Sequence, residues 1–322
     1  MSKPNAIFAV ARIRALEKKL ISKEKMDRLA ESGKDEVMRF LSESGYGQDS
    51  DSQSLDDGEA IIENELLKTY DEIDSLLEGA GEFISLFRLK YDIQNLKLLL
   101  KLRLTQSGEK PTFAQGGIYD TNKLADAVKN AKYDFLPEII ENALTFLELS
   151  FFTDKDPQLI SVTLDGAYIE YALEKGNDFA KTYFRAMADY DNIITFIRLK
   201  NISGDKKMLE KLLLPQGDIK HEKFFKFFDD DLLEAVKKLS PTKSAYQQFE
   251  QNPSAQIYEK ARDNYLLSLV KEHKEELDTM MPILGFMLAK EQEAKCVRLI
   301  VTAKRNDLPA DVIRERLREL YV

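Results

Sequence analysis

Residues 190–200 read YDNIITFIRLK, and they nearly repeat residues 91–101, which read YDIQNLKLLLK. A more divergent copy, EAKCVRLIVTAK, occupies residues 293–304. In each copy, apolar residues recur three and four positions apart, which is the spacing of one face of an α-helix. A helical segment that recurs three times along one chain predicts three similar helical modules.

A second recurring segment, the marker, precedes each copy of the helix at a similar distance. Aligned on Asn95, Asn192 and Cys296, the helix copies lie 97 and 104 residues apart. The marker reads QGGIYDTNKL at residues 115–124, QGDIKHEKFF at residues 216–225 and, in a degraded form, KLISKEKM at residues 19–26. Its isoleucines precede the three helix anchors by 74, 74 and 77 residues, and they are Ile21, Ile118 and Ile219.

The rest of the chain also favours helices. Only 14 Gly and 9 Pro occur in 322 residues, so turns are few and helices are long. The best strand candidate, LISVTL at residues 159–164, is short and lies between helical segments, so we do not interpret it as a strand. We predict an all-α fold of three modules, with boundaries at residues 1–115, 116–216 and 217–322.

One face of the repeated helix carries recurring polar residues, which form a stripe. The stripe consists of Arg88, Asp92 and Asn95 in the first copy, Arg185, Asp189 and Asn192 in the second, and Glu293 in the third. An Arg and an Asp four positions apart can pair on one helix face. Because a packing device should recur in every module, we interpret the stripe as joining helices within each module.

The opposite face of the same helix is basic. It carries Lys97, Lys101, Arg198 and Arg298. In an acidic protein, such a face is a candidate for contact with an acidic partner. An ordinary solvated face is the alternative, and the sequence does not decide between them.

Composition excludes several classes of protein. The formal net charge of −9 argues against binding to nucleic acid or directly to anionic lipid, since both are negatively charged. The first twenty residues predict no secretory signal, and no stretch approaches the roughly 20 apolar residues of a membrane helix. The single cysteine excludes an intramolecular disulfide. These features predict a cytosolic chain.

Few residues suggest chemistry. Cys296 stands where two copies have Asn and has no His near it in the sequence, so we interpret it as a packing residue. His221 and His273 lie in charged surroundings and are expected to face solvent. We predict no catalytic, metal or cofactor site.

Acidic residues and glycines before helices also have structural interpretations. The run Asp229–Asp231 stands before a helical segment, so we expect it to cap that helix. The loop glycines Gly116, Gly117 and Gly217 follow no strand, so we interpret them as helix punctuation rather than as a phosphate-binding loop.

Several long segments resemble one known family. They are ARIRALEKKLISKEKMDRLAESGKDEVMRFLSESGYG at residues 11–47, the two similar helix copies, and LAKEQEAKCVRLIVTAKRNDLPADVIRERLRELYV at residues 288–322. Together they resemble the C subunit of the V-type (A-type) rotary ATPases, whose eukaryotic counterpart is the d subunit. The resemblance extends over essentially the whole chain. It departs at Cys296, where the family usually has Asn.

The resemblance implies a function as well as a fold. It implies a funnel-like, all-α protein of three similar domains with no catalytic site and no cofactor. One copy per complex would link the central rotor shaft to the membrane proteolipid ring, on the cytoplasmic side. Transport of protons and transport of sodium ions both remain open, as do ATP synthesis and hydrolysis. The alternative is a helical-repeat scaffold for soluble partners; a helical hydrolase has no residues to recommend it.

Overall fold

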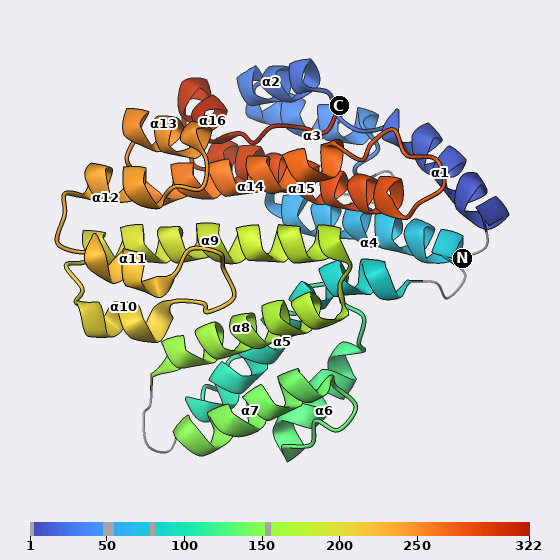
Figure 1. Cartoon of the computed structure of the whole chain (residues 1–322). Coiled ribbons are helices and arrows are strands. Elements are labelled where there is room, and N and C mark those ends of the chain that lie inside the picture. The colour runs from blue at the N-terminus through green and yellow to red at the C-terminus, as the bar shows by residue number, and fades with distance from the viewer. Residues whose placement is uncertain (1–2, 48–54, 78–80, 152–155) are drawn as a thin grey trace. The chain divides into compact units, whose positions relative to one another are not determined.

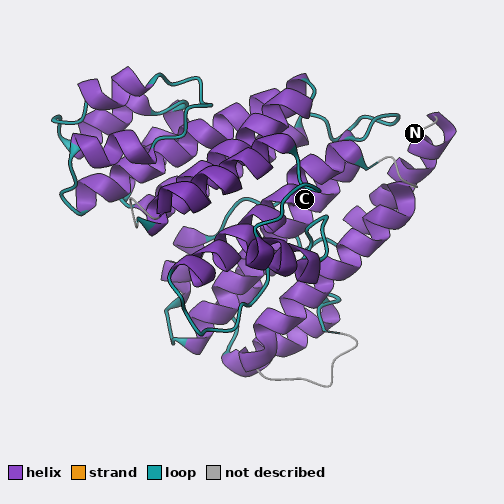
Figure 2. Cartoon of the chain, turned by 90° about the horizontal axis from the view of Figure 1, so that it is seen from below, coloured by secondary structure: helices purple, strands orange, loops and turns teal. Residues whose placement is uncertain are grey.

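The computed structural model describes residues 3–47, 55–77, 81–151 and 156–322, and these ranges contain helices and no strand (Figure 2). The all-α prediction is confirmed, and residues 159–164 lie within a helix. The helices are α1 Lys3–Glu17, α2 Lys23–Glu31, α3 Lys34–Glu43, η1 Leu55–Asp57, α4 Gly58–Leu77, α5 Glu82–Leu104, α6 Thr121–Asn130, α7 Glu138–Phe151, α8 Pro157–Lys175, α9 Asp178–Asn201, α10 Lys206–Leu212, α11 His221–Lys226, α12 Leu232–Leu239, α13 Lys243–Gln251, α14 Ala255–Lys271, α15 Met281–Arg305 and α16 Ala310–Arg316.

The chain divides into two compact units. Unit 1 contains residues 1–84 and 263–322, and unit 2 contains residues 85–262. The boundaries fall inside α5 and α14, so neither unit is delimited by a linker. The division into three modules stays a prediction.

Short polar side chains fix where many helices begin. Asp120, Asn177, Asp205 and Thr242 each accept a hydrogen bond from a backbone N–H in the first turn of the following helix. Asp231 does the same for Leu233 at the start of α12, so its predicted capping role is confirmed. Each cap satisfies an N–H group that has no partner within its helix.

Unit 1 is built around α15, which runs between α4 and α2 in Figure 1. Along most of its length α15 is buried, and it packs against α1, α2, α3, α4 and α16. Its core joins side chains from both ends of the chain: Ile21, Leu29 and Val37 pack in one cluster with Ile300 and Ile313. Unit 1 therefore requires both segments to fold.

In unit 2, α8 packs against α7 and α9, and α9 packs against α10 and α12. An aromatic cluster holds α5, α8 and α9 together. The ring centroids of Phe87 and Phe184 lie 5.1 Å apart, and those of Tyr168 and Phe184 lie 5.3 Å apart. Tyr168 also donates a hydrogen bond to the carbonyl of Leu86 at 2.9 Å, which satisfies its hydroxyl inside the core.

In the described part of the chain, no helix has the length and apolar character to cross a membrane. The same residues contain no group of three or more His, Cys, Asp and Glu side chains that could hold a metal ion.

The core of unit 1 generates a stability prediction. Ile300 is fully buried between the two terminal segments, so Ile300→Ala should lower the free energy of unfolding by about 2–5 kcal/mol through lost burial and the cavity left behind. Ile7 is 54% exposed on α1, so Ile7→Ala should change the free energy of unfolding by less than about 1 kcal/mol. Urea unfolding followed by circular dichroism measures both variants. Equal losses would contradict the assignment of this core.

Candidate functional site

The polar stripe lies at a recurring contact between a long helix and a loop. Asp92 on α5 is fully buried, and its carboxylate accepts the backbone N–H of Ile118 at 2.8 Å and that of Tyr119 at 3.2 Å. Asp120, the next residue, caps α6. One carboxylate thus fixes both the loop and the start of the helix that follows it.

The second copy repeats this contact. Asp189 on α9 accepts the backbone N–H of Ile219 at 2.9 Å and that of Asp218 at 3.2 Å, and it is 5% exposed. The residue after Ile219 is the N-cap of α11. The loop geometry of the first copy is therefore reproduced at the second.

In the third copy the contact closes between the two ends of the chain. Glu293 on α15 accepts the backbone N–H of Ile21 at 2.5 Å and the hydroxyl of Tyr46 at 2.8 Å. Ile21 immediately precedes Ser22, the N-cap of α2. Each of the first two carboxylates thus binds the marker that follows it in the sequence, and the last carboxylate binds the first marker.

These contacts correct the register of the marker. The helix N-caps are equivalent positions, and they are Ser22, Asp120 and Lys220. The residues before them are Ile21, Tyr119 and Ile219. The predicted alignment of Ile118 with Ile219 is therefore shifted by one residue, because it matched side chains where the contact is made by the backbone.

The marker glycines are required by close approach to the carboxylates. A Cβ atom on Gly117 would lie 2.3 Å from an Asp92 carboxylate oxygen, and one on Gly217 would lie 2.2 Å from an Asp189 oxygen. Any larger residue would displace the carboxylate from the loop. The interpretation of these glycines as helix punctuation missed this role.

The anchor residue of each helix binds a second part of its loop. The amide of Asn95 both accepts from and donates to the backbone of Ala114, at 2.8 and 2.9 Å. Asn192 does the same with Leu214, at 2.7 and 2.8 Å. This two-way pairing satisfies one backbone N–H and one carbonyl together with the buried amide itself.

Cys296 does not form that two-way pairing. Its thiol lies 3.8 Å from the carbonyl of Arg318, which is not part of the marker that Glu293 binds. The neighbouring Glu319 is held instead by two amides: Asn264 accepts its N–H at 2.8 Å, and Gln292 donates to its carbonyl at 3.2 Å.

The thiol of Cys296 is not an activated nucleophile. Burial raises its pKa to about 11, and the residue is fully buried in the core of unit 1. A reactive cysteine needs the opposite environment, with a lowered pKa and access to solvent. The interpretation of Cys296 as a packing residue agrees with this setting.

The stripe arginines reach the loop as well. Arg88 donates to the carbonyls of Gly116 and Gly117, at 2.9 and 3.2 Å. The side chain of Arg185 is half exposed and pairs loosely with Asp218 of the loop, at 3.6 Å. The second arginine therefore binds the exposed loop acid rather than the buried Asp189 four residues along its own helix, because the oxygens of Asp189 bind backbone N–H groups.

Two residues of the basic face lie on α5 and contact α8. Lys97 pairs with Asp165, and Lys101 donates to the hydroxyl of Ser161 at 2.9 Å. Burial raises the pKa of Asp165, and the charge of Lys97 opposes that rise. The two lysines therefore serve the packing of two neighbouring helices.

The other two residues of the basic face form ion pairs. Arg198 on α9 pairs with Glu259 on α14 at 2.5 Å. On α15, Arg298 forms a bidentate ion pair with Glu59 of α4, with N···O distances of 2.6, 2.8 and 2.9 Å. Contact of the basic face with a partner protein stays a prediction, and such a partner would compete with these internal acceptors.

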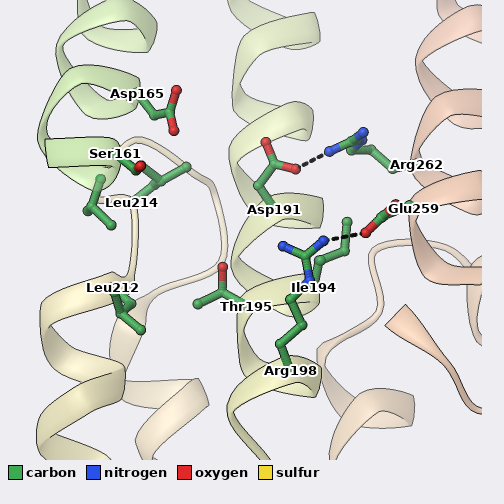
Figure 3. A pocket seen from close by; sticks show the side chains of 11 residues that line it. Ser161, Asp165, Asp191, Ile194, Thr195, Arg198, Leu212, Leu214, Glu259 and Arg262 are labelled. Atoms are coloured by element: carbon green, nitrogen blue, oxygen red, sulfur yellow. Dashed lines mark hydrogen bonds and ion pairs between the residues drawn. The ribbon is translucent and has the colours of Figure 1, made fainter. Parts of the chain in front are cut away.

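A polar pocket of about 450 Å³ lies among α8, α9, α14 and the segment after α10 (Figure 3). Within it, Arg262 pairs with Asp191 at 2.5 Å beside the Arg198–Glu259 pair. These four charged groups are thus paired with each other, and Asp165, which also lines the pocket, pairs with Lys97 of α5. Among the described residues that line it, no nucleophile stands beside a free base, so the pocket has no catalytic arrangement.

The two histidines are partly exposed, with the His273 side chain at 35%, so they reach solvent as expected but also make contacts within the protein. The Nε2 atom of His221 lies 3.0 Å from the carbonyl of Leu214, and the Nδ1 atom of His273 lies 2.6 Å from a carboxylate oxygen of Glu276. Each contact spans seven residues or fewer. Each histidine therefore holds the loop or helix end beside it.

Sequence reasoning missed one buried cluster on α15. Lys290, Glu291 and Glu293 are all less than 9% exposed; Lys290 pairs with Glu293 at 2.8 Å and with Glu65 of α4 at 3.1 Å. Tyr70 donates to Glu291 at 2.9 Å. The sequence predicts a packing role for Glu293, but Lys290 and Glu291 beside it look like a solvated helix face, and only tertiary packing shows that they are inside.

Comparison with known proteins identifies relatives of the whole chain. The family model described as ATP synthase (C/AC39) subunit matches residues 9–316. The C subunit of A-type ATP synthase from Methanosarcina acetivorans is 24% identical, with 97% of this chain and 92% of the relative covered. The C subunit of V-type sodium ATPase from Enterococcus hirae is 23% identical, with 96% and 97% covered. The resemblance seen in the sequence is confirmed.

The carboxylate contacts generate a paired mutational prediction. Asp189→Ala should lower the free energy of unfolding by about 2–4 kcal/mol, because two backbone N–H groups lose a buried acceptor. Arg185→Ala removes only a loose, half-exposed ion pair and should cost less than about 1 kcal/mol. Denaturant unfolding of both variants tests this order. A larger loss for the arginine variant would show that the stripe is held by the ion pair after all.

A second prediction concerns pH. Burial raises the pKa of Asp92 from 3.8 to about 6, against the opposing effects of the Ile118 and Tyr119 N–H groups and of Arg88. Because the folded-state pKa is raised, the stability contributed by the protonated carboxyl is complete below about pH 4 and is lost as the pH rises through 6. Between pH 4 and pH 7, the free energy of unfolding of the parent should therefore fall by about 2–3 kcal/mol relative to that of Asp92→Asn.

Unfolding curves of the parent and of Asp92→Asn, recorded at several values across that pH range, give the difference. The asparagine variant is the matched control because its side chain does not titrate and every other ionisable group is shared. A difference that stays constant with pH would contradict the raised pKa.

Proposed function

The chain belongs to the ATP synthase C/AC39 subunit family, and from that membership we propose that it is a non-catalytic central-stalk subunit of an A-type or V-type ATPase. In this proposal, one copy per complex links the rotor shaft to the membrane proteolipid ring. It passes torque between ATP chemistry and ion transport. The observation that carries the proposal is the family match across residues 9–316, supported by relatives that align over nearly their whole length.

The internal contacts are compatible with a part that transmits force. Buried carboxylates bind backbone N–H groups directly, at 2.5 to 3.2 Å, and directional contacts of this kind resist sliding of a loop along a helix. The pocket among α8, α9 and α14 has its charges paired internally (Figure 3). Both features favour a mechanical role over a catalytic one.

The proposal also places the chain at the cytoplasmic side of the membrane, in contact with the ring rather than with lipid. With a net charge of −9, the chain would be repelled by anionic headgroups. A generic scaffold for soluble partners is the alternative from the sequence. The family match favours the rotary complex over it.

The experiment that tests the proposal is reconstitution. The purified chain should bind the purified central-shaft subunits and, separately, detergent-solubilised proteolipid rings, and it should stay in the soluble fraction when floated with plain anionic liposomes. Isothermal calorimetry should detect no ATP binding to the chain alone. Flotation without the ring, or saturable ATP binding, would contradict the proposal, and binding to neither the shaft nor the ring would support the scaffold.

A further inference from the structure

Unit 1 contains a hollow of about 420 Å³. It lies where the end of α1 and the start of α2 approach the end of α3, the middle of α4 and α15. Its lining includes five lysines, and they are Lys18, Lys19, Lys25, Lys68 and Lys290. Such a concentration of cations stands out in a chain whose net charge is −9.

Two of the acids in the same lining are already engaged. Glu65 pairs with Lys290 at 3.1 Å and Glu72 with Arg12 at 2.6 Å, whereas Glu43 is exposed and only approaches Arg39, at 3.9 Å; one loosely held acid thus faces the lysines. The charge that the hollow presents to a visiting molecule is therefore set mainly by its lysines.

Three of those lysines form an available rim. Lys18, Lys19 and Lys25 are exposed, and within the described ranges no carboxylate forms an ion pair with any of them. They come from two consecutive segments, the turn that follows α1 and the first turn of α2. Their side chains can reach a common anionic partner, and little surface must be dehydrated for them to do so.

The floor of the hollow distinguishes this copy of the repeated helix from the others. Lys290 is buried, with its ammonium 4.6 Å from the centre of the Tyr46 ring and 2.8 Å from Glu293. The position six residues before the anchor is Lys290 here, Leu89 in the first copy and Ala186 in the second. A charge that appears in one copy is not part of the recurring packing, so it points to a local role.

We propose that this hollow, rimmed by Lys18, Lys19 and Lys25, binds an acidic segment of a protein partner. Glutamate or aspartate side chains of that segment would enter between the lysines, over the buried cluster of Lys290, Glu65 and Glu293. This binding does not require the partner to be part of a rotor shaft.

The local backbone favours carboxylates on a peptide over phosphate. Compact phosphate sites use free backbone N–H groups at a helix start or the fork of an arginine. Here the N–H of Ile21 is held by Glu293 and that of Lys25 by the Ser22 hydroxyl, and the described lining contains no arginine. Flexible lysines around an open hollow suit several separated carboxylates, which also gives fast, salt-dependent association.

A fluorescent oligoglutamate peptide is the probe that tests the proposal on the full chain. Its anisotropy should rise with the parent protein at low salt, and the affinity should fall as salt is added. Reversing the rim with Lys18→Glu, Lys19→Glu and Lys25→Glu together should weaken binding about tenfold or more, because three exposed ion pairs are lost.

The matched control changes the net charge by the same amount elsewhere. It reverses three exposed lysines of unit 2, with Lys129→Glu, Lys132→Glu and Lys207→Glu, and it should retain most of the affinity. An equal loss in both triple variants would show a non-specific charge effect and overturn the site.

Two further measurements complete the test. A neutral triple, Lys18→Gln, Lys19→Gln and Lys25→Gln, should keep the helical content of the parent and show a smaller loss than reversal, so the effect of the rim can be read even if the Glu variant misfolds. Tripolyphosphate tests the other anion: rim-dependent binding of tripolyphosphate without binding of the peptide would assign the hollow to a phosphate and reject the acidic segment. Absence of peptide binding to the parent at low salt would reject the site altogether.

Discussion

A buried carboxylate that accepts backbone N–H groups from a distant loop organises this protein. Ionised carboxylates are costly to bury, and two N–H donors at about 3 Å offset part of that cost while fixing the loop in one position. The glycine beside the loop follows from this contact, since Gly117 and Gly217 leave room for the oxygens. The helix that follows the loop begins at the next residues, so its start is set by the same contact. In unit 1 the carboxylate of Glu293 instead ties α15 to the segment that enters α2.

The sequence predicts the helices better than it predicts which helix contacts which marker. Helical periodicity and the scarcity of Gly and Pro predict the all-α fold, and the recurrence of Asp92 and Asp189 marks positions that are buried. Equal spacings of 74 residues suggest that each marker belongs with the helix that follows it. The hydrogen bonds of α5 and α9 run the other way, from each helix to the marker after it, because spacing records the repeat period and not the contact. Periodicity in a single chain does not distinguish these two pairings.

Charged residues are the hardest to place from sequence, for a physical reason. Lysine and arginine side chains are long, so one helix position can reach several acceptors. Arg185 therefore reaches Asp218 in the loop, and Arg298 reaches Glu59 on α4. Lys290 and Glu291 look like surface residues in the sequence, yet they are buried because α4 supplies partners for both. The contact of Tyr70 with Glu291 spans 221 residues, and a partner at that separation leaves no local signal.

The third copy of the helix differs from the other two at its anchor residue. Asn192 alone pairs with both the N–H and the carbonyl of Leu214, and a thiol cannot replace an amide that donates and accepts. Near the thiol, Asn264 accepts the N–H of Glu319 and Gln292 donates to its carbonyl, so side chains of α14 and α15 hold a different stretch of backbone close to the C-terminus. Cys296 fills space in an apolar cluster. The anchor position therefore pairs with the backbone of its loop in the first two copies and fills space in the third.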